Sequence, residues 1–115
     1  MELVVLVGSD HETWGQITGL VKKGQWDKIF FIGESLDGIS IEKESELIKI
    51  KRDQRLVDLR DDIKKKLGGK IGGTEVALSI ASGNGKEHMA VISALLTLPV
   101  GIRFAALTKE GIVQL

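Results

Sequence analysis

The sequence predicts one α/β domain over residues 1–115, built as a three-layer sandwich with a mostly parallel sheet and a C-terminal β-hairpin. Short β-branched runs alternate with amphipathic helical patterns, the first such runs are apolar on both faces, and glycine-rich turns lie between strands and helices. A chain of 115 residues is about one domain long, and a domain of this size can bury its own core.

The first part of the chain has the pattern of a strand–helix–strand unit. Residues 3–7 form a continuous apolar run, typical of a strand covered on both faces. Ser9 and Glu12 have capping-box spacing, which predicts the start of a helix that ends at Gly24. Residues 28–32 form the second apolar strand, and the crossover between two such strands is almost always right-handed.

The middle of the chain contains the clearest helix. Polar residues 35–45 predict a loop, and the alternation within 47–51 predicts an edge-type strand. The helix of residues 56–67 has one apolar stripe and otherwise charged faces, and the glycines at 68–69 end it. The stripe consists of Leu56, Leu59, Ile63 and Leu67.

The last part of the chain predicts a strand, a helix and a hairpin. Residues 75–81 form the strand, and residues 87–98 form a helix that is apolar nearly all round. Such a helix is either fully buried or packed between its own sheet and another subunit. Pro99 ends it, and residues 100–115 form a hairpin with its turn at 108–111.

Composition excludes several classes of protein. The absence of cysteine removes disulfide scaffolds, thiolate metal sites and cysteine nucleophiles, and two histidines argue against a multi-His metal centre. We therefore expect no metal and no cofactor. The balance of 16 basic and 16 acidic residues argues against a coat for duplex nucleic acid. Without a signal-peptide pattern or an apolar run of about 20 residues, we expect a cytoplasmic protein with no membrane partner.

The order of elements predicts where a ligand binds. A Rossmann-like strand order places the first strand beside the strand of residues 75–81. Ligands of such sheets bind in the crevice beyond the carboxyl ends of the strands. The residues that follow these two strands meet there, and they are Gly8, Ser9, Asp10, Ser82, Gly83, Asn84, Gly85 and Lys86.

The segment of residues 82–86 is the strongest local signal for function. Its glycines let the backbone approach an anion, the following helix directs amide N–H groups toward it, and Lys86 adds a full charge. The segment is neither a Walker A loop, since Ile80 and Glu87 stand at required positions, nor a dinucleotide fingerprint, since His88 replaces the third glycine. The alternative is a strand–helix turn that needs glycine for its backbone and carries a solvated lysine.

The other candidates are weaker. Ser9 and Asp10 are candidates for contacting a ribose or base with His11 as a proton shuttle, but the pattern favours a helix cap with an exposed histidine. Glu34 and Ser35 end the second strand, where acidic residues bind ribose hydroxyls in related folds.

Several residues have mainly structural interpretations. His88 is expected to serve packing or an interface, and Arg103 needs either a phosphate or a carboxylate as partner. Trp14 and Trp26 are expected in the core or an interface, and the lysines at 64–66 form a solvated helix face.

Residues 81–90 (ASGNGKEHMA) resemble the second motif of the CARF family, the CRISPR-associated Rossmann-like domains. The segment from Gly8 to Asp10 fits the family's loosely defined first motif, and residues 98–101 resemble its exit from helix to strand. Gly85 stands where threonine is commoner in the family, so ligand contacts would depend more on backbone amides.

The resemblance implies a homodimer that binds cyclic oligoadenylate, the second messenger of type III CRISPR defence, across its two-fold axis. Because the sensor fold accounts for the 115 residues, the resemblance implies a standalone member, either a binding subunit or a metal-independent ring nuclease. In a nuclease, a ribose 2′-OH would attack the adjacent phosphorus and leave a 2′,3′-cyclic phosphate. Lys86 and the amides of 83–85 would stabilise the developing charge, Ser82 and Ser9 would orient the sugar-phosphate, and His11 would move a proton.

Two other classes of function fit the same sequence. One is a non-enzymatic interaction subunit that uses the apolar helix and the hairpin as its interface. The other is a protein that binds a mononucleotide or dinucleotide on the same scaffold, with one ligand per subunit rather than one per dimer.

Overall fold

A computed structural model describes residues 1–39 and 44–115 of the chain. Five parallel strands and one antiparallel strand form a single sheet in the order β3-β2-β1-β4-β5-β6. The strands are β1 (Glu2–Leu6), β2 (Ile29–Gly33), β3 (Ser45–Lys49), β4 (Glu75–Ser79), β5 (Gly101–Thr108) and β6 (Gly111–Gln114). The helices are the short 3-10 turn η1 (His11–Thr13), α1 (Trp14–Lys23), α2 (Leu56–Leu67) and α3 (Gly85–Thr97). The predicted α/β class, mostly parallel sheet and C-terminal hairpin are confirmed.

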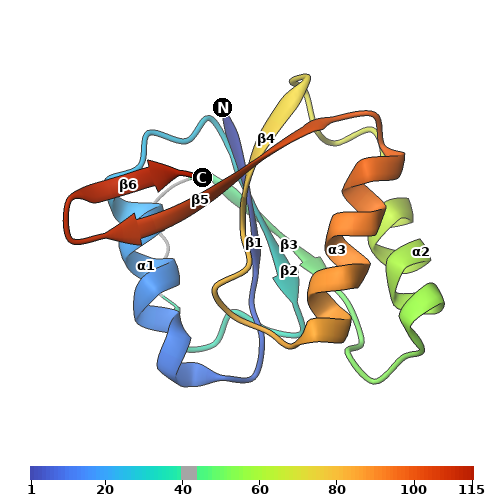
Figure 1. The fold of residues 1–115 in the computed structure, drawn as a ribbon. Helices are drawn as coiled ribbons and strands as arrows, with labels where there is room; N and C mark the ends of the chain where they lie inside the picture. The colour runs from blue at the N-terminus through green and yellow to red at the C-terminus, as the bar shows by residue number, and fades with distance from the viewer. Residues whose placement is uncertain (40–43) are drawn as a thin grey trace.

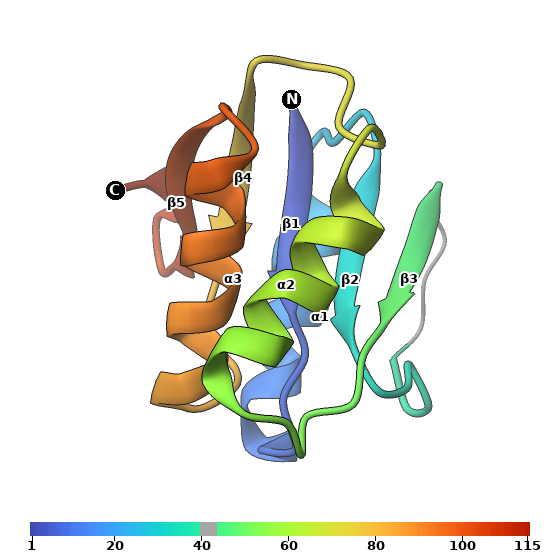
Figure 2. The same cartoon turned by 90° about the vertical axis from the view of Figure 1, so that its right-hand side faces the viewer.

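Helices cover both faces of the sheet. Helix α1 lies on one face, and α2 and α3 lie side by side on the other (Figures 1 and 2). Each face has its own apolar cluster, because successive side chains of a strand point to opposite faces. In β1, Val4 and Leu6 join the cluster beneath α2 and α3, whereas Leu3 and Val5 join the cluster beneath α1.

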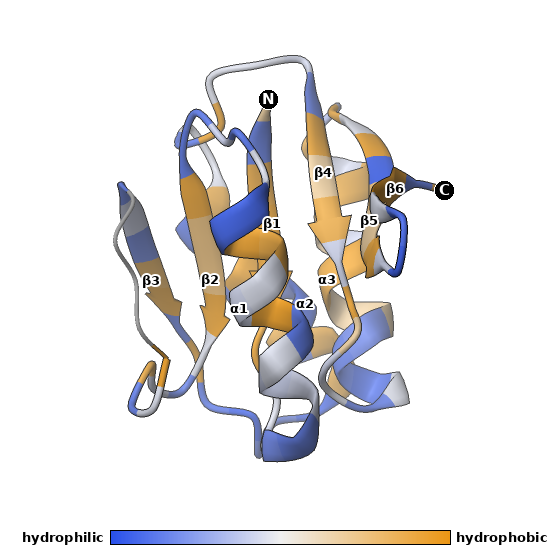
Figure 3. Cartoon of the chain, turned by 90° about the vertical axis from the view of Figure 1, so that its left-hand side faces the viewer, coloured by the Kyte–Doolittle hydropathy of each residue, from blue (hydrophilic) through white to orange (hydrophobic). Residues whose placement is uncertain are grey.

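The central strands are buried on both faces, as their apolar runs predict. All five residues of β2 are buried, and Phe30 and Phe31 are among the largest fully buried side chains. Figure 3 shows the hydrophobic central strands behind α1 and the more polar β3 at the edge. Burying one such side chain contributes about 1.5–3 kcal/mol, so these strands form the stable part of the fold.

Helix α2 confirms the predicted amphipathic stripe. Leu59, Ile63 and Leu67 are buried, and the backbone N–H of Gly68 caps the helix by donating to the carbonyl of Lys64. The lysines at 64–66 are exposed, as expected of a solvated face at a helix C-terminus. Helix α1 likewise ends at the predicted Gly24.

The predicted capping box at Ser9 and Glu12 is wrong. Helix α1 begins only at Trp14, after η1, and neither element has a side-chain hydrogen bond at its N-cap. The Asp10 carboxylate instead reaches across to the turn after β4, 72 residues away in the sequence. A long-range contact therefore takes the place of the local cap.

Several other predicted boundaries differ from the structure. Strand β3 covers Ser45–Lys49 rather than 47–51, because its pairing with β2 runs out where Gly33 meets Lys49. Helix α3 begins two residues earlier than expected, at Gly85. The predicted loop at 35–45 falls partly on residues 40–43, which lie outside the described residues.

Helix α3 is not fully buried. Ala90, Val91 and Leu95 have no exposed surface, but Met89 and Leu96 are 58% and 66% exposed. The helix therefore packs on the sheet and on α2 while part of its apolar outer face is open to solvent. No helix within residues 1–39 and 44–115 is long and apolar enough to cross a membrane.

Candidate functional site

Two glycine turns meet at the carboxyl ends of β1 and β4. The order of strands reverses between these two, since the chain runs outward from β1 to β3 and then returns to the other side of β1. The turns touch so closely that a Cβ atom on Gly8 would lie 2.6 Å from the Cα atom of Gly83. Gly83 also has a φ of +98°, which favours glycine.

A buried network joins the two turns. The Ser82 hydroxyl accepts from the Gly8 amide (2.9 Å) and donates to Asp10 Oδ1 (2.7 Å), which also accepts from the Gly83 amide (3.0 Å). Ser82 has no exposed surface. Burial acts to raise the pKa of Asp10, but the hydrogen bonds from Gly83 and Ser82 outweigh it, so the pKa lies below the usual value.

The first turn of α3 carries a true capping box. The Asn84 side chain accepts from the Glu87 amide, and Glu87 Oε1 accepts from the Asn84 amide, both at 2.9 Å. The next two amide groups, of Gly85 and Lys86, have no hydrogen-bond acceptor among the residues that the structure describes. A Cβ on Gly85 would meet nothing within 4 Å, so the side-chain position of this residue is open.

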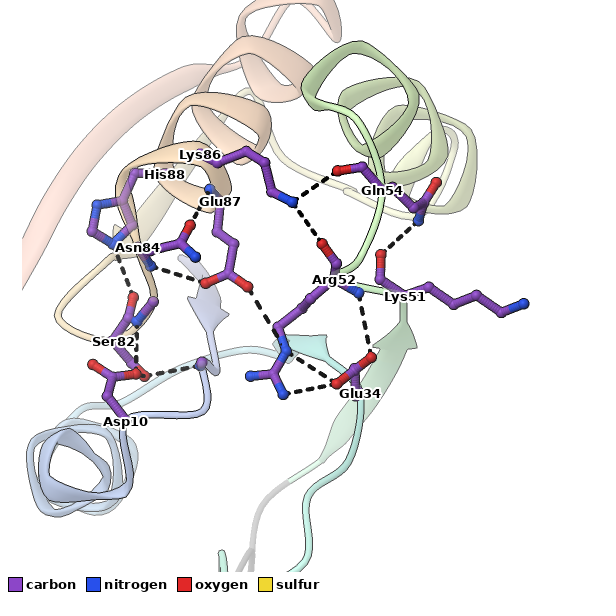
Figure 4. A network of polar contacts seen from close by, with 12 residues as sticks. Asp10, Glu34, Lys51, Arg52, Gln54, Ser82, Asn84, Lys86, Glu87 and His88 are labelled. Atoms are coloured by element: carbon purple, nitrogen blue, oxygen red, sulfur yellow. Dashed lines mark hydrogen bonds and ion pairs between the residues drawn. The ribbon is translucent and has the colours of Figure 1, made fainter.

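Lys86 has a different partner from the one that the sequence suggests. Its Nζ donates to the carbonyl oxygens of Arg52 (2.9 Å) and Gln54 (2.8 Å), in the loop between β3 and α2 (Figure 4). The half-buried side chain thus ties the start of α3 to that loop. Lys86 lines the cavity over the start of α3, but two of the three N–H groups of its ammonium already have protein acceptors.

The two histidines lie on different sides of the turns. His88 Nε2 is 3.0 Å from the carbonyl oxygen of Ser82, within hydrogen-bond distance of the turn before α3. The His11 ring stacks on Trp14 with 4.0 Å between centroids, and Trp14 donates to the Gly8 carbonyl. His11 is exposed at the mouth of a second cavity.

Sequence reasoning missed Arg52. Its Nη2 and Nε both donate to Glu34 Oε1, at 2.7 and 3.1 Å, and Nε lies 3.8 Å from the buried Glu87 carboxylate (Figure 4). The hydrogen bond and charge of Arg52 hold the pKa of Glu34 below its usual value. A signal did exist, because Arg52 follows β3 and the carboxyl ends of all parallel strands share one edge.

Two adjoining cavities lie beside the turns. One of about 220 Å³ reaches from the β1 turn toward the residues after β2, and one of about 330 Å³ lies over the start of α3. Ser9, Glu34 and Arg52 line both. The space directly between the turns is filled by Asp10 and Ser82, so the open volume lies toward β2, β3 and α3.

The structure therefore brings together most of the predicted site residues. They lie together at one edge of the sheet and comprise Gly8, Ser9, Asp10 and the segment of residues 82–86, with Glu34 beside them. Arg103 lies elsewhere and donates to Glu75 on the neighbouring strand (3.0 Å), so its partner is a carboxylate, one of the two partners that the sequence allows.

No family model and no curated protein sequence matches the chain.

Proposed function

We propose that the chain is a Rossmann-like domain that binds a phosphate-containing nucleotide at the carboxyl edge of its sheet. The ligand is cyclic oligoadenylate and the binding unit is a homodimer, as the resemblance of residues 81–90 to the CARF family implies. The observation that carries the proposal is the meeting of two glycine turns where the strand order reverses, because open parallel sheets bind ligands at that point.

The surroundings of α3 support binding of phosphate. The unpartnered amides of Gly85 and Lys86 and the positive end of the helix dipole favour an anion in the cavity over the helix start. No neighbouring atom explains why glycine is needed at position 85. The close approach of a ligand to the backbone there would explain it. Lys86 and Arg52 contribute positive charge to the same cavity.

The exposed apolar side chains of α3 support a homodimer. Met89 and Leu96 lie two turns apart on its outer face, and the half-buried Ile92 lies on the turn between them. A second copy that covers this face would bury surface that water otherwise meets. A two-fold arrangement also suits a cyclic ligand of repeated units, since each subunit presents the same phosphate site.

Cleavage of the ligand is the more demanding part of the proposal. The 2′-oxygen would bond to the adjacent phosphorus while the bond to the 5′-oxygen breaks, and the 2′ proton would pass to that leaving oxygen. Lys86, Ser82 and His11 stay the predicted catalytic residues. The present partners of Ser82 and Lys86 favour binding over fast turnover, because both groups would have to leave protein hydrogen bonds to act.

The test is calorimetric titration of the pure protein with cyclic tetra-adenylate and cyclic hexa-adenylate in EDTA. We expect micromolar or tighter binding of at least one ring at one ring per dimer, and Gly85→Ala should weaken it without unfolding the protein. Chromatography of the same mixtures detects any 2′,3′-cyclic phosphate product. Absence of micromolar binding to both rings overturns the proposal, and one ligand per subunit indicates a mononucleotide or dinucleotide instead.

One observation favours the second candidate, a non-enzymatic sensing or interaction subunit. Asp10 and Ser82 fill the space between the two turns, and the Gly8 and Gly83 amides and the Ser82 hydroxyl all donate to acceptors within the protein. In that case α3 and the hairpin form the functional surface. A dimer that binds neither ring nor any nucleotide supports this candidate.

A further inference from the structure

Arg52 lines both of the cavities beside the turns. Both are also lined by Glu34, which stands directly after β2. The Arg52 side chain is 25% exposed and that of Glu34 is 44% exposed, so solvent and small solutes reach this ion pair. Figure 4 shows the pair below the Lys86 side chain and beside Glu87.

Glu34 contacts Arg52 in the way that a phosphate group would. One carboxylate oxygen accepts from Nη2 and Nε, and the other accepts from the Arg52 backbone amide at 3.3 Å. Arginine binds carboxylate and phosphate oxygens with the same donors, so either anion satisfies the same face of the guanidinium. Because the Glu34 side chain is 44% exposed, a phosphate in solution can approach the same donors.

The balance of charge around the cavity makes the binding of an anion depend on Arg52. Among the residues that the structure describes, the cavity over α3 is lined by three acidic residues, Glu34, Asp53 and Glu87, and by two basic ones, Arg52 and Lys86. Without Arg52, three negative groups would face one positive group. The ammonium of Lys86 is bound to two backbone carbonyl oxygens, whereas the guanidinium of Arg52 is held by a partly exposed side-chain carboxylate, for which an anion from solution can compete.

Lys86 fixes the backbone that carries Arg52. One of its two acceptors is the carbonyl oxygen of Arg52 itself, and the other belongs to Gln54, two residues further on. These bonds link the first turn of α3 to the loop after β3 and set the position from which the Arg52 side chain extends.

We propose that Arg52 is the phosphate-binding residue of this site, that Glu34 holds it in place of phosphate in the free protein, and that Lys86 acts as a positioning residue for it. This inference rests on the proposed function, since it takes phosphate esters to bind at this edge. It changes the assignment of roles, because the lysine singled out by the sequence acts through its neighbour.

The test compares the full chain with Arg52→Gln, Glu34→Gln, Lys86→Met and the double variant Arg52→Gln/Lys86→Met. Cyclic tetra-adenylate is titrated by calorimetry, and AMP is titrated by NMR while the Arg52 Nε–Hε resonance is followed. Arg55→Gln is the matched control, because Arg55 is an arginine in the same region with an 87% exposed side chain that pairs with Asp58. Thermal melting of each variant shows whether it is folded.

We expect Arg52→Gln to lower affinity at least about tenfold, the loss that follows removal of a charged hydrogen bond. Glu34→Gln should raise affinity about two- to fivefold, because a partly exposed ion pair contributes at most about 1 kcal/mol. Lys86→Met should weaken binding as a single substitution. In the double variant Arg52→Gln/Lys86→Met it should cause no further loss of affinity beyond that of Arg52→Gln. AMP should shift the Arg52 Nε–Hε resonance in the wild type.

Three results would distinguish a failure of this inference from a failure of the proposed function. Full additivity of the Arg52→Gln and Lys86→Met losses would mean that Lys86 contacts phosphate itself. Unchanged affinity in a folded Arg52→Gln protein that binds the ring would mean that the ion pair is structural, with the proposed function intact. An Arg52 response to AMP without binding of either cyclic adenylate would retain the inference and reject the cyclic ligand.

Discussion

Gly8 and Gly83 are in contact at the carboxyl ends of β1 and β4, with no room for a side chain between them. A Cβ atom on Gly8 would lie 2.6 Å from both the Cα and the amide nitrogen of Gly83. This approach brings Asp10 and Ser82 into hydrogen-bond distance and closes the space between the turns. The two glycines therefore determine where open volume remains for a ligand.

The substitution Gly8→Ala is expected to destabilise the protein by about 1–3 kcal/mol. The added methyl group would meet backbone atoms, which cannot rotate away as a flexible side chain can. Urea denaturation with a fixed m-value measures the change in the free energy of unfolding. An unchanged denaturation midpoint would show that the two turns do not pack as described.

Alanine substitutions at Gly83 and Gly85 should have different effects on stability. Gly83→Ala should cost about 1–3 kcal/mol, because alanine is strained at a φ of +98° and its Cβ would approach Leu6. Gly85→Ala should be neutral or gain up to about 1 kcal/mol, because Gly85 lies in open space at the start of α3. Thermal melting of both variants tests this contrast, and equal destabilisation would contradict it.

The substitution Ser82→Ala should cost about 1–3 kcal/mol by removing the acceptor of the Gly8 amide in a buried place. Ser9→Ala is the control, since Ser9 is exposed and should change stability by less than about 0.5 kcal/mol. Denaturant unfolding of the two variants gives the comparison. A Ser82→Ala protein as stable as the control would mean that water replaces the lost hydroxyl.

Asp10 should make stability depend on acid pH. Because the fold lowers the pKa of Asp10 below 3.8, the charged form stabilises the protein above that value. This contribution is lost as the pH falls through the lowered pKa. The stability difference between wild type and Asp10→Asn should therefore be largest near neutral pH and shrink below about pH 4.

Melting curves of both proteins between neutral pH and about pH 3 measure this difference. Glu34 and Glu46 also have lowered pKa values, but they are unchanged in both proteins and cancel in the comparison. A difference that stays constant with pH would show that the Asp10 charge contributes nothing to folding.

The outer face of α3 should control the oligomeric state. Leu96→Lys places a charge on the most exposed part of the proposed contact and should convert a dimer to a monomer without changing thermal stability of the subunit by more than about 0.5 kcal/mol. Val57→Lys is the control, since Val57 is 54% exposed on α2. Light scattering coupled to size-exclusion chromatography gives the mass, and a monomeric wild type or a dimeric Leu96→Lys protein would contradict the proposal.

Local patterns predicted most of the elements but fewer of their boundaries. The α2 stripe of Leu59, Ile63 and Leu67 follows from helical periodicity, and Gly24 and Gly68 end their helices as their positions indicate. The boundary of β3 depends on where its partner β2 ends, which no local pattern encodes. Likewise Ser9 and Glu12 have the spacing of a cap, while the actual capping box is formed by Asn84 and Glu87.

The sequence alone determined the succession of strands and helices and the glycine turns after two strands, because periodicity and turn chemistry act over a few residues. Only the tertiary structure decided which charged groups face each other. The partners of Lys86 lie 32 and 34 residues away, and Glu34 and Arg52 are 18 apart. Such pairs form because parallel strands end at one edge of the sheet, a relationship set by strand order rather than by neighbouring residues.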